Sequence, residues 1–159
     1  MTRVACLLLV LAFLGLDALA ASASGCRGKA VSRIGLVLDT IGYGTLNEVS
    51  GAMGFFQLTN SSAVGITLPG WVREGTLWLE YPVATIQVKD GSWKDVTPMI
   101  GSFLTDGSDK ETVAPGKSLR VAARLDFGVP VEARKARLVI NLPNETCVIS
   151  SPFSLPARR

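Results

Sequence analysis

The sequence predicts an all-β protein, an antiparallel β-sandwich of about 7–9 strands. Short stretches in which apolar and polar residues alternate recur along the chain, and Gly, Pro, Asn and Asp residues separate them. No stretch after residue 23 shows the sustained 3.6-residue period of an amphipathic helix. Strands that are apolar on one face need a second sheet to cover that face, and this requirement predicts two packed sheets.

The N-terminal segment has the pattern of a secretory signal peptide. A positive start at Arg3 precedes the apolar run Val4–Leu16, and small-residue cleavage sites follow, after Ala20 or Ala23. The rival interpretation is a membrane anchor, but spanning needs roughly 20 apolar residues and Asp17 interrupts the run. We therefore predict a signal peptide over residues 1–23 and a single domain over residues 24–159, exported to the periplasm or secreted. The short, alanine-rich signal is typical of bacteria.

The cysteines point to an oxidising compartment. Cys6 lies in the predicted signal peptide, which leaves Cys26 and Cys147 as an even pair. In an exported protein such a pair predicts a disulfide, here between the start of the domain and its last strands. The alternative is a lipoprotein, because Ala23–Cys26 loosely resembles a lipobox. Acylation at Cys26 would make the chain a lipid-anchored structural protein of the envelope.

The first half of the domain is expected to form a strand, a loop and a hairpin. Ile34–Ile41 is apolar and β-rich. Gly42–Gly54 contains four glycines and is expected to be a mobile connection; a phosphate-binding loop would need a following helix, and none is indicated. Phe55–Thr59 and Val64–Leu68 both alternate, and a turn separates them, which predicts a hairpin.

The stretch Thr76–Val96 is the predicted centre of the sandwich. Its second half alternates from Ala84 to Lys89, turns at Asp90–Ser92 and returns through Trp93–Val96. The apolar residues before Tyr81-Pro82 have the opposite phase, so we expect a bulge or strand break there.

The C-terminal part predicts three further strands. Leu119–Phe127 has the clearest alternation in the chain, Leu138–Leu142 forms the next apolar set, and Thr146–Ile149 returns after a turn.

The pattern broadly resembles the immunoglobulin-like domains of bacterial envelope proteins. The matching pieces are the hairpin Phe56–Asn60, the strand and turn Tyr81–Trp93, and the strand entry Pro115–Ser118. The resemblance covers most of the domain and implies an immunoglobulin-like sandwich. The antibody spacing of Cys, Trp and Cys is missing, so the resemblance is one of architecture.

Little in the composition indicates catalysis. The chain has no His, which removes the commonest general base and metal ligand. Asp106, Asp109 and Glu111 share one loop but lack the spacing of a calcium loop. The net charge of +3 includes no long basic stripe for nucleic acid. We predict no enzyme, no metal site and no cofactor.

Aromatic residues give the main functional signal. The candidate partner-binding residues are Trp71, Trp78, Tyr81 and Trp93, which lie within a short span. An exposed Trp on a sheet face can anchor a partner. The alternative is that Trp78 is covered and belongs to the core.

The sequons Asn60-Ser61-Ser62 and Asn144-Glu145-Thr146 are interpreted as turns, since a bacterial chain would not use them for glycosylation. Together these features predict an exported, non-enzymatic binding or accessory module of the bacterial envelope. Its expected partner is another envelope protein or a surface glycan, not nucleic acid, and it would contact the membrane only if lipidated at Cys26.

Overall fold

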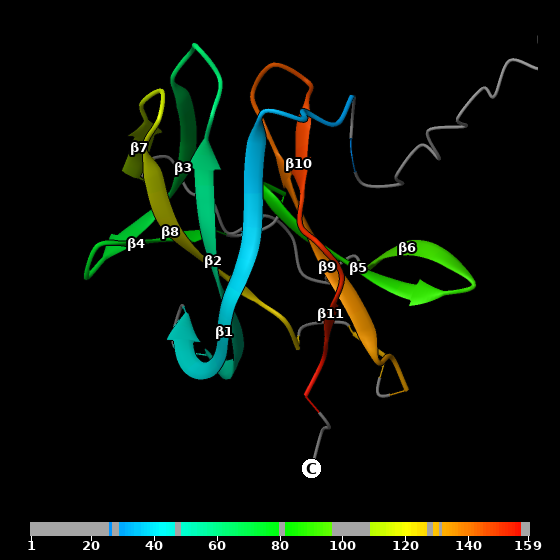
Figure 1. Ribbon diagram of the computed structural model, residues 1–159. Helices are drawn as coiled ribbons and strands as arrows, with labels where there is room; N and C mark the ends of the chain where they lie inside the picture. Colours follow the sequence, from blue (N-terminus) through cyan, green and yellow to red (C-terminus); the bar gives the residue numbers. More distant parts are fainter. Residues whose placement is uncertain are drawn as a thin grey trace, which may run out of the picture.

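The computed structural model describes residues 26, 29–46, 49–79, 82–96, 109–126, 129–130 and 132–156. These residues form eleven strands in two facing sheets (Figure 1). One sheet has the order β1-β2-β8-β4-β3-β7, and the other has the order β10-β9-β5-β6 with β11 paired to β9. The predicted signal peptide, residues 1–23, lies outside the described residues.

The six-stranded sheet contains β1 (Ile34–Leu46), β2 (Val49–Asn60), β3 (Ile66–Arg73), β4 (Thr76–Leu79), β7 (Asp109–Val113) and β8 (Ser118–Arg124). The second sheet contains β5 (Ala84–Asp90), β6 (Ser92–Val96), β9 (Lys135–Asn141), β10 (Cys147–Ile149) and β11 (Phe153–Ser154).

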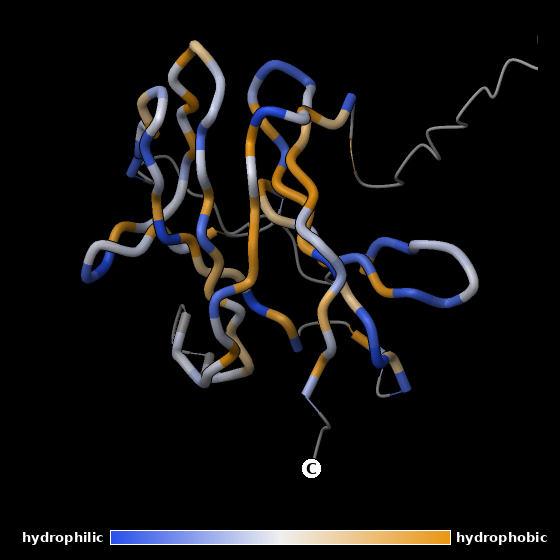
Figure 2. Tube along the Cα trace, viewed as in Figure 1, coloured by the Kyte–Doolittle hydropathy of each residue, from blue (hydrophilic) through white to orange (hydrophobic). Residues whose placement is uncertain are grey.

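One hydrophobic core lies between the sheets. Alternate residues of each strand point into it, as the period of two requires, and the tube in Figure 2 alternates in hydropathy along several strands. Phe56 of β2 and Leu138 of β9 are fully buried on the facing sides. The predicted immunoglobulin-like sandwich, two packed sheets dominated by antiparallel pairs, is confirmed. The described residues form more strands than expected, because β7 lies where a loop was expected and the two-residue β11 is a further short piece. One pairing, that of β4 with β8, is parallel.

The sequence located several strands well. The hairpin of β5 and β6 turns at Gly91, whose φ of 64° suits glycine. Alternation also marked β8 and β9 where the structure has them. In each case the residues of one face are buried in the core and the other face is largely polar. The alternation that marks the strand can therefore be read from its own residues.

The expected loop at Gly42–Gly54 is wrong. β1 and β2 continue as a paired hairpin through this stretch, with Gly42 opposite Met53 and Gly44 opposite Gly51. Among these glycines, Gly54 is needed for close packing, because a Cβ there would lie 2.7 Å from Cε2 of Phe56. Their composition suggested a mobile loop, but their role depends on neighbours that are distant in sequence.

The predicted hairpin between Phe55–Thr59 and Val64–Leu68 is also wrong, because β2 pairs with β1 and β8 while β3 pairs with β4 and β7. The phase change at Tyr81-Pro82 is a crossing between sheets, since β4 and β5 belong to different sheets. Tyr81 itself lies outside the described residues. A crossing and a bulge leave the same signal in a sequence, because both reverse which residues face the core.

The predicted disulfide is present. Cys26 and Cys147 are joined across a sequence separation of 121. The neighbouring residues 29–31 run beside β10, where Val31 N donates to Cys147 O at 2.9 Å and Cys147 N donates to Lys29 O at 3.2 Å. The sulfur of Cys26 is therefore engaged in the disulfide and not available for the thioether that a lipoprotein needs.

In the part of the chain that the structure describes, no helix is long and apolar enough to span a membrane.

Candidate binding surface

The structure separates the aromatic residues that the sequence placed together. Trp71 of β3 and Trp78 of β4 are register partners on the outer face of the six-stranded sheet. Trp93 of β6 lies on the outer face of the second sheet, opposite Lys89 of β5. The sandwich core lies between these faces, so one partner surface cannot include all three tryptophans in the way their sequence proximity suggested. The fourth candidate, Tyr81, is outside the described residues.

Trp78 is half-buried under the end of the β1–β2 hairpin. Its ring meets Phe55 edge to face, with centroids 5.9 Å apart. A Cβ on Gly44 would lie 3.2 Å from its Cη2 atom, and Met53 beside it is fully buried. The indole N–H groups of Trp71 and Trp78 are buried and have no hydrogen-bond partner among the described residues. The face is therefore covered in part, although by a curled hairpin and not by the second sheet.

Two cations lie close to the ring of Trp93. The guanidinium carbon of Arg137 lies 4.4 Å from the centre of its ring, and Lys89 Nζ lies 5.3 Å from the same centre. Arg137 also donates from Nε to Gln87 Oε1 at 2.6 Å, and Gln87 Nε2 donates to Asp95 Oδ1 at 2.8 Å. Gln87 points away from the core, as its alternation with Ile86 and Val88 indicates, but neighbouring side chains bury it fully. These contacts form a connected polar chain along the outer face of the second sheet.

Burial controls the electrostatics of this chain. Burial raises the pKa of Asp95, and the nearby charge of Arg137 lowers it only in part. Burial also lowers the pKa of Arg137, which Asp95 offsets in part. By contrast, the exposed Asp90 on the same hairpin has a lowered pKa, because Lys94 Nζ donates a hydrogen bond to it at 2.6 Å and adds a favourable charge.

We expect Asp95→Asn to alter how stability depends on pH. A raised carboxyl pKa means that the folded protein holds a proton which the unfolded chain has released. Charged Asp95 therefore costs stability above its pKa, and this cost fades as the pH falls through that pKa towards the ordinary value of about 3.9. The melting temperature of Asp95→Asn minus that of wild type should therefore decrease as the pH is lowered from about 7 to about 4.

Asp90→Asn provides the matched control on the same hairpin. The pKa of Asp90 is shifted in the opposite direction, downward. Wild type should therefore lose stability relative to Asp90→Asn as the pH falls, first through the ordinary pKa of an aspartate and then through the lowered pKa of Asp90. Thermal unfolding of the three proteins across this pH range measures both trends. A constant gap for Asp95→Asn would contradict the raised pKa.

The longest exposed strand edge belongs to β1. Among the described strands β1 pairs only with β2, and it forms one end of the six-stranded sheet. Leu125 N donates to Ala52 O at 2.8 Å, so the backbone groups of Ala52 point toward β8. Because hydrogen-bonded and non-hydrogen-bonded pairs alternate in an antiparallel ladder, Tyr43, the partner of Ala52, directs its own N–H and C=O away from β2. The open edge of β1 therefore offers backbone donors and acceptors.

The same rule applies at the other end of β1. Asn60 N donates to Lys117 O at 2.9 Å and its carbonyl accepts from Gly116 N at 2.7 Å, so Ile34, opposite Asn60, also directs its backbone groups away from β2. Residues 29–31, which lead into β1, run beside β10, and β1 itself lies close to β10, so the open part of the edge is the part around Tyr43. Between the two ends, a register shift between Leu38 and Thr40 marks a bulge at Asp39. Arg120 Nη2 lies 3.5 Å from Asp39 Oδ2, which ties the bulge to β8.

The other sheet edges are shorter or protected. β7 carries Asp109, Lys110 and Glu111, and β6 carries Lys94 and Asp95. β10 has three residues, and its edge is paired by residues 29–31. Charges, short length and covering segments are the usual means by which proteins prevent unwanted strand pairing. β1 has thirteen residues and a single charged side chain, at Asp39.

Two side chains of β1 are unusually exposed for their type. Val37 is 59% exposed, and Tyr43 is 86% exposed. Sequence reasoning missed both, because Val37 fitted a strand and Tyr43 lay in the expected glycine loop. Tyr43 could have been recognised as an aromatic residue between Gly42 and Gly44, in a segment that continues the preceding strand.

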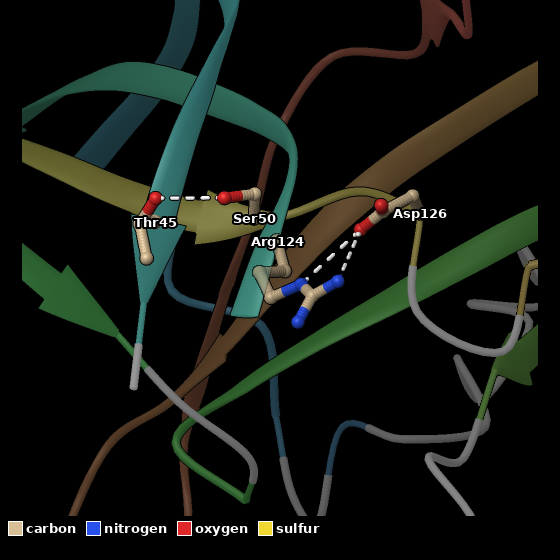
Figure 3. A network of polar contacts seen from close by, with 4 residues as sticks. All are labelled: Thr45, Ser50, Arg124 and Asp126. Atoms are coloured by element: carbon tan, nitrogen blue, oxygen red, sulfur yellow. Dashed lines mark hydrogen bonds and ion pairs between the residues drawn. The ribbon is translucent and has the colours of Figure 1, made fainter. Parts of the chain in front are cut away.

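The end of the β1–β2 hairpin is held by polar contacts, which Figure 3 shows from close by. Thr45 Oγ1 and Ser50 Oγ lie 2.9 Å apart across the hairpin. Arg124 of β8 reaches Asp126 with two hydrogen bonds, of 3.2 Å and 3.1 Å. A Cβ on Gly51 would lie 2.7 Å from Arg124 Nη2, so this ion pair packs directly over the glycine backbone. The hairpin that bears Tyr43 is thereby fixed against β8.

Within the described residues, no three His, Cys, Asp or Glu side chains are grouped to hold a metal ion. Of the acidic loop considered above, Asp109 and Glu111 lie on β7, where Asp109 Oδ2 accepts from Val72 N at 3.1 Å. Asp106 is outside the described residues.

Comparisons with known proteins give little further guidance. No protein-family model matches the chain, and no curated protein matches it. Among solved structures, the chain is similar to the archaellum periplasmic stator protein FlaG from Sulfolobus acidocaldarius. The TM-score is 0.36 and the identity 15%, over 76% of this chain and 99% of that chain. A similarity at this level does not bear on function.

Proposed function

We propose that the chain is an exported, non-enzymatic binding module of the cell envelope. It binds another envelope protein by accepting an extended strand of that protein at the open edge of β1. The observation that carries the proposal is this edge, which is long, carries one charged side chain and displays Val37 and Tyr43. A partner strand would satisfy the outward backbone groups and cover both side chains.

Export is supported by the disulfide. Cys26–Cys147 joins residues from opposite ends of the domain, and such bonds persist in oxidising compartments. The expected signal peptide over residues 1–23 agrees with this location. Engagement of the Cys26 sulfur disfavours the lipid-anchored alternative.

The tryptophans retain a smaller role in this proposal. Trp71 and Trp78 lie on the same sheet as β1, but β2 and β8 separate β1 from the strands that carry them. Only a partner that also folds back over the outer face of this sheet would reach their exposed parts. Trp93 lies on the other sheet, where Lys89 and Arg137 flank it. We assign the primary contact to β1 for this reason.

Variants at Tyr43 test the proposal. Tyr43→Pro removes an outward N–H without breaking a bond to β2, whereas Tyr43→Thr removes the ring but keeps the N–H. Loss of one ladder hydrogen bond, with a proline ring in the path of the partner strand, should weaken partner binding about tenfold or more. The readout is retention of the partner from envelope extracts of the native host, with thermal unfolding as the control for folding.

Tyr43→Thr should bind more strongly than Tyr43→Pro, and both should melt near the wild-type temperature, because Tyr43 is largely exposed. Equal partner retention by wild type and Tyr43→Pro, with both folded, would contradict strand addition at this edge. If Tyr43→Pro loses stability, Val37→Lys replaces it, since that exposed side chain lies on the same strand and its charge opposes pairing.

A further inference from the structure

The two sequons of the chain occupy opposite environments. Asn60 is fully buried, whereas Asn144 is exposed in the turn between β9 and β10. Both satisfy the Asn-x-Ser/Thr pattern that N-linked glycosylation requires. The difference lies in what the amide nitrogen of each side chain does in the folded protein.

The amide nitrogen of Asn60 is fully used. Nδ2 donates to Val64 O at 2.8 Å and to Val113 O at 2.9 Å, which engages both of its hydrogens. Its Oδ1 accepts from the backbone N and the hydroxyl of Ser62, at 3.0 Å and 2.7 Å. A sugar on Nδ2 would remove one of these donors and would have to enter a buried site. A chain glycosylated at Asn60 is therefore incompatible with this fold.

Asn144 presents its amide nitrogen outward. Thr146 donates from its hydroxyl to Asn144 Oδ1 at 2.6 Å and from its backbone N to the same atom at 3.3 Å. These bonds engage the oxygen and leave Nδ2 without a hydrogen bond to any described residue. Pro143, Asn144 and Glu145 are all exposed, and Leu142 N closes the turn by donating to Thr146 O at 2.9 Å. The sequon hydroxyl thus orients the amide while its nitrogen stays accessible.

We propose that Asn144 is an N-glycan attachment site of the exported protein and that Asn60 is not. This replaces the interpretation of Asn144 as a turn residue alone, and it requires a host whose export pathway transfers oligosaccharides to Asn-x-Ser/Thr, unlike the bacterial host expected from the signal peptide. The donor is an oligosaccharide carried on a lipid diphosphate. Asn144 Nδ2 forms a bond to the anomeric carbon, the bond from that carbon to the diphosphate oxygen breaks, and the lipid diphosphate leaves with the electron pair. Nδ2 loses one of its two protons to a base of the transferase. The inference rests on export, which is part of the proposed function, but not on binding at β1.

The test is peptide mass mapping of the protein purified from its native host. Trypsin places the sequons on separate peptides, residues 34–73 and residues 138–158. The expected result is a saccharide mass on the second peptide and the unmodified mass on the first. Thr146→Val, which keeps the size of the side chain but loses its hydroxyl, should abolish the modification. Thr146→Ser should retain it, and N144Q should remove it.

Two results would overturn the inference: an unmodified 138–158 peptide from the native protein, or a saccharide on the 34–73 peptide of folded protein. The same mass mapping distinguishes an exported protein that lacks the glycan from a protein that is not exported. A disulfide between Cys26 and Cys147 together with an unmodified Asn144 would contradict the proposed glycan site but not the proposed export. Reduced cysteines in protein purified under thiol-blocking conditions would instead count against export.

Discussion

Removing the Cys26–Cys147 disulfide is expected to lower the free energy of unfolding by about 4–5 kcal/mol. The bond closes a loop with a sequence separation of 121, so it restricts the unfolded chain over most of the domain. In the chain-entropy model the stabilisation grows with the logarithm of the loop length. The bond also holds the end of the chain that runs beside β10, where Cys147 is fully buried.

Urea unfolding of the oxidised protein and of a Cys26→Ser, Cys147→Ala double variant measures this effect. The variant should unfold at a lower urea concentration. Its dependence on urea should be steeper, because an unfolded chain without the cross-link exposes more surface. Mass spectrometry must first confirm that the wild-type protein is oxidised. Coincident unfolding curves would show that the disulfide contributes little to the free energy of unfolding.

Phe56→Ala is expected to destabilise the domain by about 3–5 kcal/mol. Phe56 of β2 is fully buried, and its ring meets Phe153 of β11 at a centroid distance of 5.5 Å. The contact joins the two sheets, so its loss weakens the sandwich and not one strand alone. The ring also lies over Gly54, which has no side chain to fill the resulting cavity. Poor collapse around a cavity places such a substitution at the costly end of its range.

Gln57→Ala is the matched control, because Gln57 is the next residue along β2 and is exposed on the opposite face. This surface substitution should change stability by no more than about 0.5 kcal/mol. Phe56→Leu should fall between the two, since it keeps part of the apolar volume. Thermal or urea unfolding of all three compares them. A loss below about 1 kcal/mol for Phe56→Ala would show that the two sheets close around the gap.

The sequence predicted features that are encoded within a single strand. β8 and the β5–β6 hairpin were located because their alternation and their turn at Gly91 are local. The disulfide was predicted because only one pairing of the remaining cysteines was possible. In these cases no information from distant parts of the chain was needed.

The features that depend on distant contacts were missed. Gly44 looked like part of a loop because its packing against Trp78 involves a strand far along the chain. Gln87 points away from the core as its strand pattern predicts, but its burial between Arg137 and Asp95 on that face could not be predicted. The open edge of β1 could not be predicted from the sequence for the same reason, because strand order is set by pairings between residues widely separated in sequence.

The measurement that tests the proposed function most directly is photo-cross-linking from position 43 in cells of the native host. A benzophenone-bearing amino acid replaces Tyr43, an exposed aromatic residue, and in a control protein replaces the exposed Lys94 of β6. Strand addition at β1 predicts one discrete adduct with an envelope protein from position 43 and none from position 94. The absence of an adduct from position 43, or the same adduct from both positions, would contradict binding at the edge of β1.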